Sequence, residues 1–183
     1  MIFRTLDITF SLIGLVVFSP LMIVIALLGV FDTGVPLFLQ HRLGRDQKPF
    51  LVCKFRTMRL DTISQVSHLA DRSAITPLGL FLRKSKLDEM PQLVNVLIGD
   101  MSLVGPRPGL TDHAELTKAR DSYGVFRVRP GITGLSQING IDMSSPEKLA
   151  KMDAEMINSF SIGLYLHCLV MTLLGRGRGD QIN

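Results

Sequence analysis

The sequence ITFSLIGLVVFSPLMIVIALLGVF, residues 8–31, contains 24 residues and no charged side chain. At 1.5 Å per residue, a helix of this length extends about 36 Å, which is enough to cross the hydrocarbon core of a bilayer. Asp32 and Thr33 follow it and do not resemble a signal-peptide cleavage site. The run therefore predicts a retained membrane anchor. Residues 164–174 form a shorter apolar run, which predicts a buried or interfacial helix.

Ser19 and Pro20 lie at the middle of the longer run. Proline lacks a backbone N–H and disfavours a helical conformation of the preceding residue, so we expect a bend there. The helix either spans the membrane with a kink or re-enters the leaflet from which it came, in two halves of about 18 Å each. Arg4 is the only basic residue before the run, whereas the chain after Asp32 has a net charge of +5. The positive-inside tendency keeps such a charge in the cytoplasm. Charge alone leaves both topologies open.

The composition is that of one globular domain with an apolar excess. The chain has 183 residues, of which 46% are hydrophobic and 20% charged, which excludes a disordered protein. Cys53 and Cys168 are too few and too far apart for a disulfide framework or a zinc site. The net charge of +4 permits nucleic-acid binding, but tryptophan is absent and no recognition motif is present, so that class is not favoured.

After the anchor, the pattern predicts an α+β fold with a β-hairpin and several helices. The strands of the hairpin are expected at residues 35–41 and 50–56, on either side of a turn-rich segment. Thr76 as N-cap and Pro77 at the first helical position predict the start of a helix. Further helices are expected at 92–98, 146–158 and 163–174, a strand at 132–138, and irregular structure at 105–109. The predicted organisation is a membrane helix over residues 1–32 and a catalytic domain with interfacial helices over residues 33–183.

Asp88 and Glu89 form an acidic pair that follows three cations, Arg83, Lys84 and Lys86. Paired carboxylates can hold Mg²⁺ while it bridges phosphate oxygens, and a helix N-terminus is expected to keep such a carboxylate ionised and nucleophilic. The alternative is structural, because Ser85-x-x-Asp88 also resembles a capping box.

Three arginines lie in rigid or turn-forming contexts: Arg56 in KFRTM, Arg107 in GPRPG and Arg129 in VRPG. Their guanidinium groups are suited to bind a phosphate or a nucleotide through paired hydrogen bonds. The alternative is that they are ordinary arginines in surface loops.

The stretch SKLDEMPQLVNVLIGDMSLVGPRP, residues 85–108, resembles the bacterial sugar transferases, the monotopic phosphoglycosyl transferases of the small single-domain type. The resemblance continues through Q-x-R-x-G at 40–44, KFRTM at 54–58 and RPGITGLSQING at 129–140. It also includes the Ser19-Pro20 break in the N-terminal apolar helix, and it covers essentially the whole chain.

This resemblance implies transfer of a phospho-sugar from a UDP-sugar to polyprenol (undecaprenyl) phosphate, with release of UMP. Asp88 corresponds to the family's nucleophile, which forms a covalent phosphosugar intermediate, and Glu89 to its acidic partner, with Mg²⁺ as cofactor. The resemblance also implies a re-entrant helix at Ser19-Pro20. It places the enzyme on the cytoplasmic face of the bacterial inner membrane, at the first membrane step of glycoconjugate assembly.

The resemblance assigns Arg83 and the segment Pro106-Arg107-Pro108 to substrate binding, with the latter associated with the nucleotide. The sequence departs from the family at Ile141, where relatives often carry an arginine after Asn139-Gly140. A non-catalytic scaffold that binds anionic lipid through a basic face is the alternative function. The carboxylate pair among cations argues against it.

Overall fold

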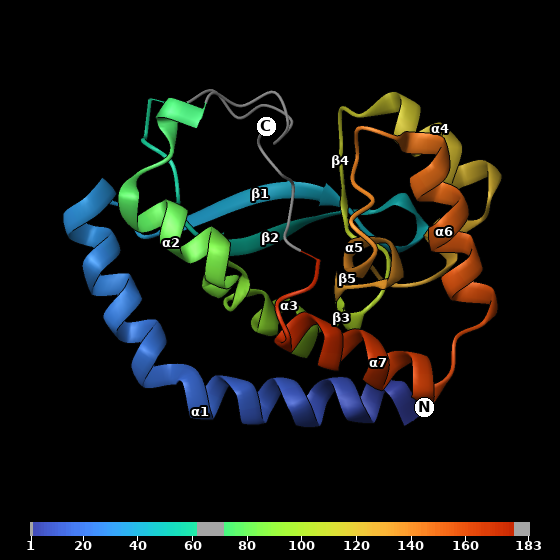
Figure 1. Ribbon diagram of the computed structural model, residues 1–183, viewed down its shortest axis with the longest axis horizontal. Coiled ribbons are helices and arrows are strands. Elements are labelled where there is room, and N and C mark those ends of the chain that lie inside the picture. Colours follow the sequence, from blue (N-terminus) through green and yellow to red (C-terminus); the bar gives the residue numbers. More distant parts are fainter. Residues whose placement is uncertain (1, 62–71, 178–183) are drawn as a thin grey trace.

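The computed structural model describes residues 2–61 and 72–177, and they form the predicted α+β fold (Figure 1). Residues 178 onward of the predicted domain lie outside the described residues. A long helix lies along one side of the molecule, and two small sheets with shorter helices form the remainder. The helices are α1 Ile2–Thr33, α2 Pro77–Ser85, α3 Gln92–Ile98, α4 Ala114–Ser122, α5 Leu135–Ile138, α6 Pro146–Asn158 and α7 Ile162–Leu173. The strands are β1 Leu37–Leu43, β2 Pro49–Phe55, β3 Ser102–Val104, β4 Gly109–Leu110 and β5 Gly131–Thr133.

Helix α1 is bent but continuous, although Pro20 lies inside it (Figure 1). The missing N–H of Pro20 would have donated to the carbonyl of Val16, four residues earlier. The hydroxyl of Ser19 donates to that carbonyl instead, at 2.9 Å. The expected bend is therefore present (Figure 1), and the two halves remain one continuous helix to Thr33 because a side chain replaces the lost backbone partner.

Both ends of α1 are fixed to the same domain by polar contacts. Near its start, Arg4 donates to the carbonyls of Val96 and Leu97 at the end of α3, at 2.6 and 2.9 Å. At its end, Asp32 accepts a hydrogen bond of 2.6 Å from Thr76, the N-cap of α2. Because the helix is bent, its two ends reach different parts of one folded unit.

Asp7 is a buried carboxylate on the domain side of α1. It accepts hydrogen bonds from the hydroxyl of Ser102, the backbone N–H of Leu103 and the hydroxyl of Tyr165. These partners belong to β3 and α7, so a single side chain joins three elements. Burial of a charge is tolerated where hydrogen bonds replace its water.

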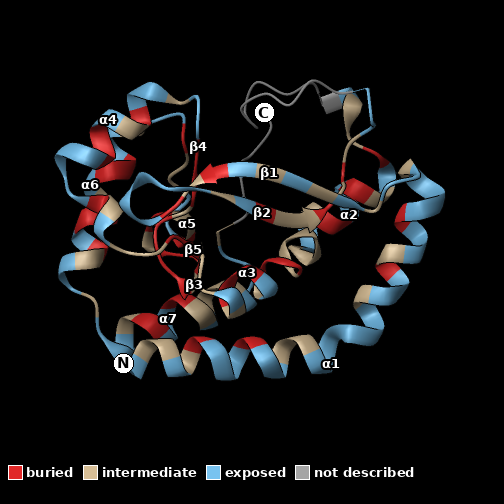
Figure 2. Cartoon of the chain, turned by 180° about the vertical axis from the view of Figure 1, so that it is seen from behind, coloured by how far each residue is buried: buried red, intermediate tan, exposed pale blue. Residues whose placement is uncertain are grey.

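The opposite face of α1 is apolar and exposed, as the pale blue colouring of much of this helix in Figure 2 shows. Among the described helices, α1 alone is long and apolar enough to cross a membrane. Helix α7, the predicted interfacial segment, also carries exposed apolar side chains, and Leu173 is 86% exposed. An exposed apolar surface of this extent is typical of a face that meets lipid or another protein.

The hairpin is confirmed, with strands that start two residues later in β1 and one residue earlier in β2 than expected. The register runs from Leu37 opposite Phe55 to Leu43 opposite Pro49. Strand β4 extends the sheet on the β1 side. On the β2 side, Asn95 of α3 accepts from the N–H of Cys53 and donates to the carbonyl of Leu51. A helix side chain thus satisfies this edge of the sheet.

Four predicted helices are confirmed, and two have the expected bounds, α3 at Gln92–Ile98 and α6 at Pro146–Asn158. The hydroxyl of Thr76 accepts from the N–H of Gly79, as an N-cap does. The strand expected over 132–138 is partly wrong, because only Gly131–Thr133 is extended and Leu135–Ile138 is helical. The chain turns at Gly134, where a Cβ atom would lie 2.3 Å from the carbonyl oxygen of Gly105.

Candidate active site

Asp88 and Glu89 lie in a single 3₁₀ turn, Leu87–Glu89, between α2 and α3. Lys86 precedes this turn in the left-handed conformation, with φ of 58°, and ends α2. The capping box expected from Ser85 and Asp88 is not formed. Ser85 belongs to the last turn of α2, where its hydroxyl donates to the carbonyls of Phe81 and Leu82.

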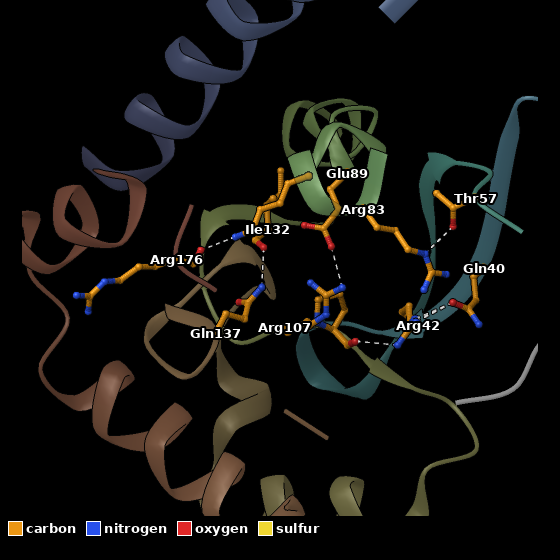
Figure 3. A network of polar contacts seen from close by, with 11 residues as sticks. Gln40, Arg42, Thr57, Arg83, Glu89, Arg107, Ile132, Gln137 and Arg176 are labelled. Carbon is orange, nitrogen blue, oxygen red and sulfur yellow. Dashed lines mark hydrogen bonds and ion pairs between the residues drawn. The ribbon is translucent and has the colours of Figure 1, made fainter. Parts of the chain in front are cut away.

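Two arginines lie close to the acidic pair, and Figure 3 shows Arg107 directed at Glu89 and Arg83 directed at Thr57. Arg107 forms an ion pair with Glu89, with 2.7 Å between Nη2 and Oε1, and both side chains are largely buried. Arg83 of α2 donates from Nε to the hydroxyl of Thr57 at 2.8 Å, and its charge acts on Asp88. An ion pair removed from water is screened little, so the contact with Arg107 orients the Glu89 carboxylate.

Burial, together with the neighbouring charge of Glu89, raises the pKa of Asp88 to about 7, although Lys54, Arg83 and Arg107 oppose the rise. The expectation that a helix N-terminus keeps this carboxylate ionised is therefore wrong for the ligand-free protein. Asp88 lies in a 3₁₀ turn before α3, where loss of water has a larger effect than the charge of the surrounding cations.

Lys54 of β2 is a functional candidate that the sequence analysis did not single out, although it lies in the quoted KFRTM motif. Burial, together with the charges of Arg42, Arg107 and Arg83, lowers its pKa to about 8, although Asp88 opposes this change. An ammonium group with a lowered pKa beside a carboxylate with a raised pKa is typical of a reactive site. The available signal was a lysine in an otherwise apolar predicted strand.

The loop of residues 105–108 holds Arg107 by its backbone. Arg120 donates to the carbonyl of Arg107 at 2.7 Å, and Arg42 donates to the carbonyl of Pro108 at 3.3 Å. The carbonyl of Pro106 accepts from the N–H of Gly131 at 2.8 Å. Glycine is required at position 131, because a Cβ atom there would lie 2.1 Å from the backbone nitrogen of Gly105. The loop is rigid for these reasons, and it directs Arg107 towards Glu89.

The other two predicted arginines have different surroundings. Arg56 donates to the carbonyls of Val35 and Leu37 at the open end of the hairpin. Arg129 donates from Nε to the carbonyl of Gly99 at 2.7 Å, and it lines a separate cavity. Of the predicted phosphate-binding arginines, the fold therefore brings Arg83 and Arg107 to the acidic pair.

Ile141, the position of the departure from the family pattern, packs on an apolar cluster. Its partners are the buried residues Leu116, Met143 and Leu149 of the α4–α6 region. An arginine in this place would have to leave that cluster to reach a phosphate. The local role of Ile141 is therefore packing.

The acidic pair fits a magnesium ion by its donor chemistry. Within residues 2–61 and 72–177, no group of three or more His, Cys, Asp or Glu side chains is placed to hold a metal. Mg²⁺ does not need such a cage, because it keeps several waters and binds through one or two carboxylates together with substrate phosphates. Asp88 and Glu89 supply the two carboxylates.

A carboxylate pair close to cations, on a domain joined to a helix long and apolar enough to cross a membrane, is typical of membrane-associated enzymes that act on phosphate-bearing substrates. The family model described as bacterial sugar transferase matches residues 1–177. The chain belongs to the bacterial sugar transferase family.

Individual relatives agree with this assignment. The chain is 43% identical over 141 residues to the uncharacterized sugar transferase EpsL of Bacillus subtilis, covering 76% of this chain and 69% of that protein. It is 39% and 36% identical to proteins of Klebsiella pneumoniae and Escherichia coli, each named UDP-glucose:undecaprenyl-phosphate glucose-1-phosphate transferase. These matches cover 94% and 93% of this chain, but only 40% and 39% of those longer relatives.

Proposed function

We propose that the protein transfers a phospho-sugar from a UDP-sugar to undecaprenyl phosphate and releases UMP. The observation that carries the proposal is the Asp88–Glu89 pair, desolvated and surrounded by Lys54, Arg83 and Arg107. The names of the Klebsiella pneumoniae and Escherichia coli relatives support the same donor class and acceptor.

In the first step, a carboxylate oxygen of Asp88 attacks the sugar-linked phosphorus of the donor. The bond from that phosphorus to the bridging oxygen breaks, its electron pair stays on UMP, and an acyl phosphate that links Asp88 to the phosphosugar forms. In the second step, a phosphate oxygen of undecaprenyl phosphate attacks the same phosphorus. The bond between the phosphorus and the Asp88 oxygen breaks, and the carboxylate is regenerated.

The surrounding residues bind and neutralise the diphosphate. Arg107 is directed at the site by its backbone and by Glu89, while Lys54 and Arg83 bring positive charge close to Asp88. These charges favour ionised Asp88 and oppose the charge that develops on the leaving phosphate. Mg²⁺ held by Asp88 and Glu89 would act as a Lewis acid on phosphate oxygens.

The shape of α1 supports a re-entrant position in the membrane. A helix that crossed a bilayer would place its ends on opposite sides, about 30 Å or more apart. Here Arg4 and Asp32, at the two ends, both contact one domain. We therefore place the domain on the cytoplasmic face of the bacterial inner membrane, where the phosphate of a lipid acceptor reaches Asp88.

Trapping of the intermediate tests the mechanism. The purified protein is incubated with a panel of UDP-sugars and Mg²⁺, without undecaprenyl phosphate. We expect UMP release up to about one equivalent per site and a phosphosugar adduct that peptide mapping places on Asp88. Asp88→Asn should abolish both, whereas Asp112→Asn, an exposed control, should retain both. UMP release that requires both substrates, without any adduct, would contradict the covalent step.

Removal of metal tests the cofactor separately. A chelator should abolish UMP release, and Mg²⁺ should restore it, because the metal ion would supply the Lewis acid that polarises the diphosphate oxygens. Full turnover in chelator would remove Mg²⁺ from the mechanism. A protein that binds anionic vesicles but releases no UMP with any donor would instead be the non-catalytic scaffold.

A further inference from the structure

A cavity of about 250 Å³ lies apart from the acidic pair. It is bounded by the first turns of α1, the turn of the hairpin, β3, the 3₁₀ turn Val125–Arg127 and the end of α6. Gly105 and Pro106 form part of its wall, whereas Asp88, Glu89, Lys54 and Arg83 do not line it. The cavity is therefore a second site, separated from the first by the backbone of the loop that carries Arg107.

Four arginines line this cavity, namely Arg4, Arg45, Arg127 and Arg129. The contacts of three of them engage only part of each guanidinium group. Arg129 donates from Nε to Gly99, Arg127 donates from Nη2 to Asn158, and Arg45 lies 3.6 Å from exposed Asp46. Arginines that line one cavity are suited to bind a phosphate there.

The positive charge of the cavity is poorly compensated. In the part of the chain that the structure describes, Asp7 is the only carboxylate in the lining, and no ion pair joins Arg127 or Arg129 to an acidic side chain. Asp7 is buried and already accepts hydrogen bonds from Ser102, Leu103 and Tyr165. An anionic ligand would complete the charge balance.

The remaining walls are apolar and continue towards the anchor helix. Phe3 belongs to α1, while Met156, Ile157 and Phe160 come from the end of α6 and the segment after it. Ile2 and Ile8, which are next in sequence to the lining residues Phe3 and Asp7 of α1, are exposed apolar side chains. A ligand that fits both features has a phosphate head and a hydrocarbon tail.

We propose that this cavity binds the phosphate headgroup of an anionic phospholipid, with its acyl chains along the exposed apolar face of α1. The inference rests on the membrane position of α1 in the proposed function, and it assigns to Arg45 and Arg127 a role outside catalysis. The bound lipid would hold the N-terminal end of α1 at the membrane surface.

Lipid binding by the full chain tests the proposal. The protein in detergent is titrated with phosphatidylglycerol and, separately, with phosphatidylcholine, and bound lipid is counted by native mass spectrometry. We expect selective binding of phosphatidylglycerol. The double variant Arg45→Gln, Arg127→Gln should weaken that binding about tenfold or more, because each basic residue near a membrane surface contributes about 1 kcal/mol. Both side chains are exposed, so the fold should tolerate the change.

A matched double variant, Lys118→Gln with Lys151→Gln, removes the same charge from exposed positions outside the cavity. It should bind phosphatidylglycerol as the wild type does, and equal losses in the two variants would overturn the proposal. Inorganic phosphate is the second probe. If it displaces the lipid and binds as tightly through the same arginines, the site is one for a soluble phosphate and the lipid assignment fails.

This test is independent of catalysis, because it uses neither a UDP-sugar nor undecaprenyl phosphate. Lipid binding lost only with the cavity arginines supports the second site even if no UMP is released. UMP release with unselective lipid binding supports the proposed function and overturns the second site.

Discussion

Asp88 is held in a position where its charge is unfavourable in the ligand-free protein. Burial and the charge of Glu89 raise its pKa to about 7, against an ordinary value of 3.8. Three cations oppose the rise without cancelling it. A nucleophile that is kept partly protonated becomes fully ionised when further positive charge arrives, so substrate and metal binding would activate it.

This arrangement predicts a pH-dependent gain of stability for Asp88→Asn in chelator-containing buffer. Between about pH 4 and 7 the unfolded chain loses the Asp88 proton while the folded protein keeps it, so wild-type stability falls as pH rises. Above pH 7 the folded protein also loses this proton, and the free-energy cost of the ionised, buried Asp88 reaches its full value. We expect the variant to be more stable than the wild type by roughly 1–3 kcal/mol at pH 8, and equal to it at pH 4.

Denaturant unfolding at the two pH values measures this difference. Asp112→Asn removes an exposed carboxylate and should leave stability unchanged at both. An equal stabilisation by Asp88→Asn at pH 4 and pH 8 would show that its charge is not the cause.

At the scale of elements, the bend of α1 depends on one missing N–H. Pro20→Leu restores a donor for the carbonyl of Val16, which Ser19 now satisfies. We expect the variant helix to straighten and to shift molecules towards a spanning topology. To test this, a cysteine is introduced at Ile2 in a Cys53→Ser background, and an impermeant thiol reagent is added outside intact cells. The cysteine should be protected when Pro20 is present and labelled in the Pro20→Leu variant.

Two comparisons make the topology result specific. Leu21→Met keeps the proline and should leave the probe protected. A cysteine at Lys148, on the domain, should be protected in every variant. Labelling at position 2 in the helix that retains Pro20 would establish a spanning anchor and contradict the re-entrant arrangement.

Helix α7 supplies a second test at this scale, because Cys168 on its inner face is fully buried. Burial raises the pKa of the Cys168 thiol to about 11, so little thiolate forms at pH 8. We expect slow alkylation in the folded protein and rapid alkylation in denaturant. Leu166→Cys, exposed on the same helix, should react quickly in both conditions. Rapid reaction of native Cys168 would mean that α7 does not stay packed.

At the scale of the whole molecule, one buried ion pair connects the helices to the site. Asp153 of α6 accepts from Arg120 of α4 at 2.7 Å and from Ser136 of α5. Both charged side chains are almost fully buried, at 1% and 3% exposed. Because Arg120 also holds the carbonyl of Arg107, the packing of three helices positions an active-site arginine.

Asp153→Ala would leave the Arg120 guanidinium buried without its partner. We expect a loss of about 3–5 kcal/mol in the free energy of unfolding, measured by urea titration. Lys151→Ala, exposed on the same helix, should change stability by less than about 0.5 kcal/mol. The pair replacement Arg120→Met with Asp153→Leu should recover most of the stability. It should still lower the rate of UMP release, because the carbonyl of Arg107 loses its donor.

The sequence alone determined the features that depend on neighbouring residues. The apolar run, the N-cap at Thr76 and the bounds of α3 and α6 all follow from local periodicity and from capping residues. The hairpin follows from two apolar runs that flank a turn. Long ordered motifs were sufficient for the family.

The tertiary structure alone decided which similar residues share a site. Arg107 and Arg129 both lie beside proline and glycine, yet one pairs with Glu89 and the other lines the second cavity. Their separation depends on the parallel pairing of β3 with β5, which joins segments about 30 residues apart. The role of Lys54 and the raised pKa of Asp88 are also visible only in the tertiary structure. Desolvation and charge pairing depend on contacts between distant segments, which local sequence patterns do not specify.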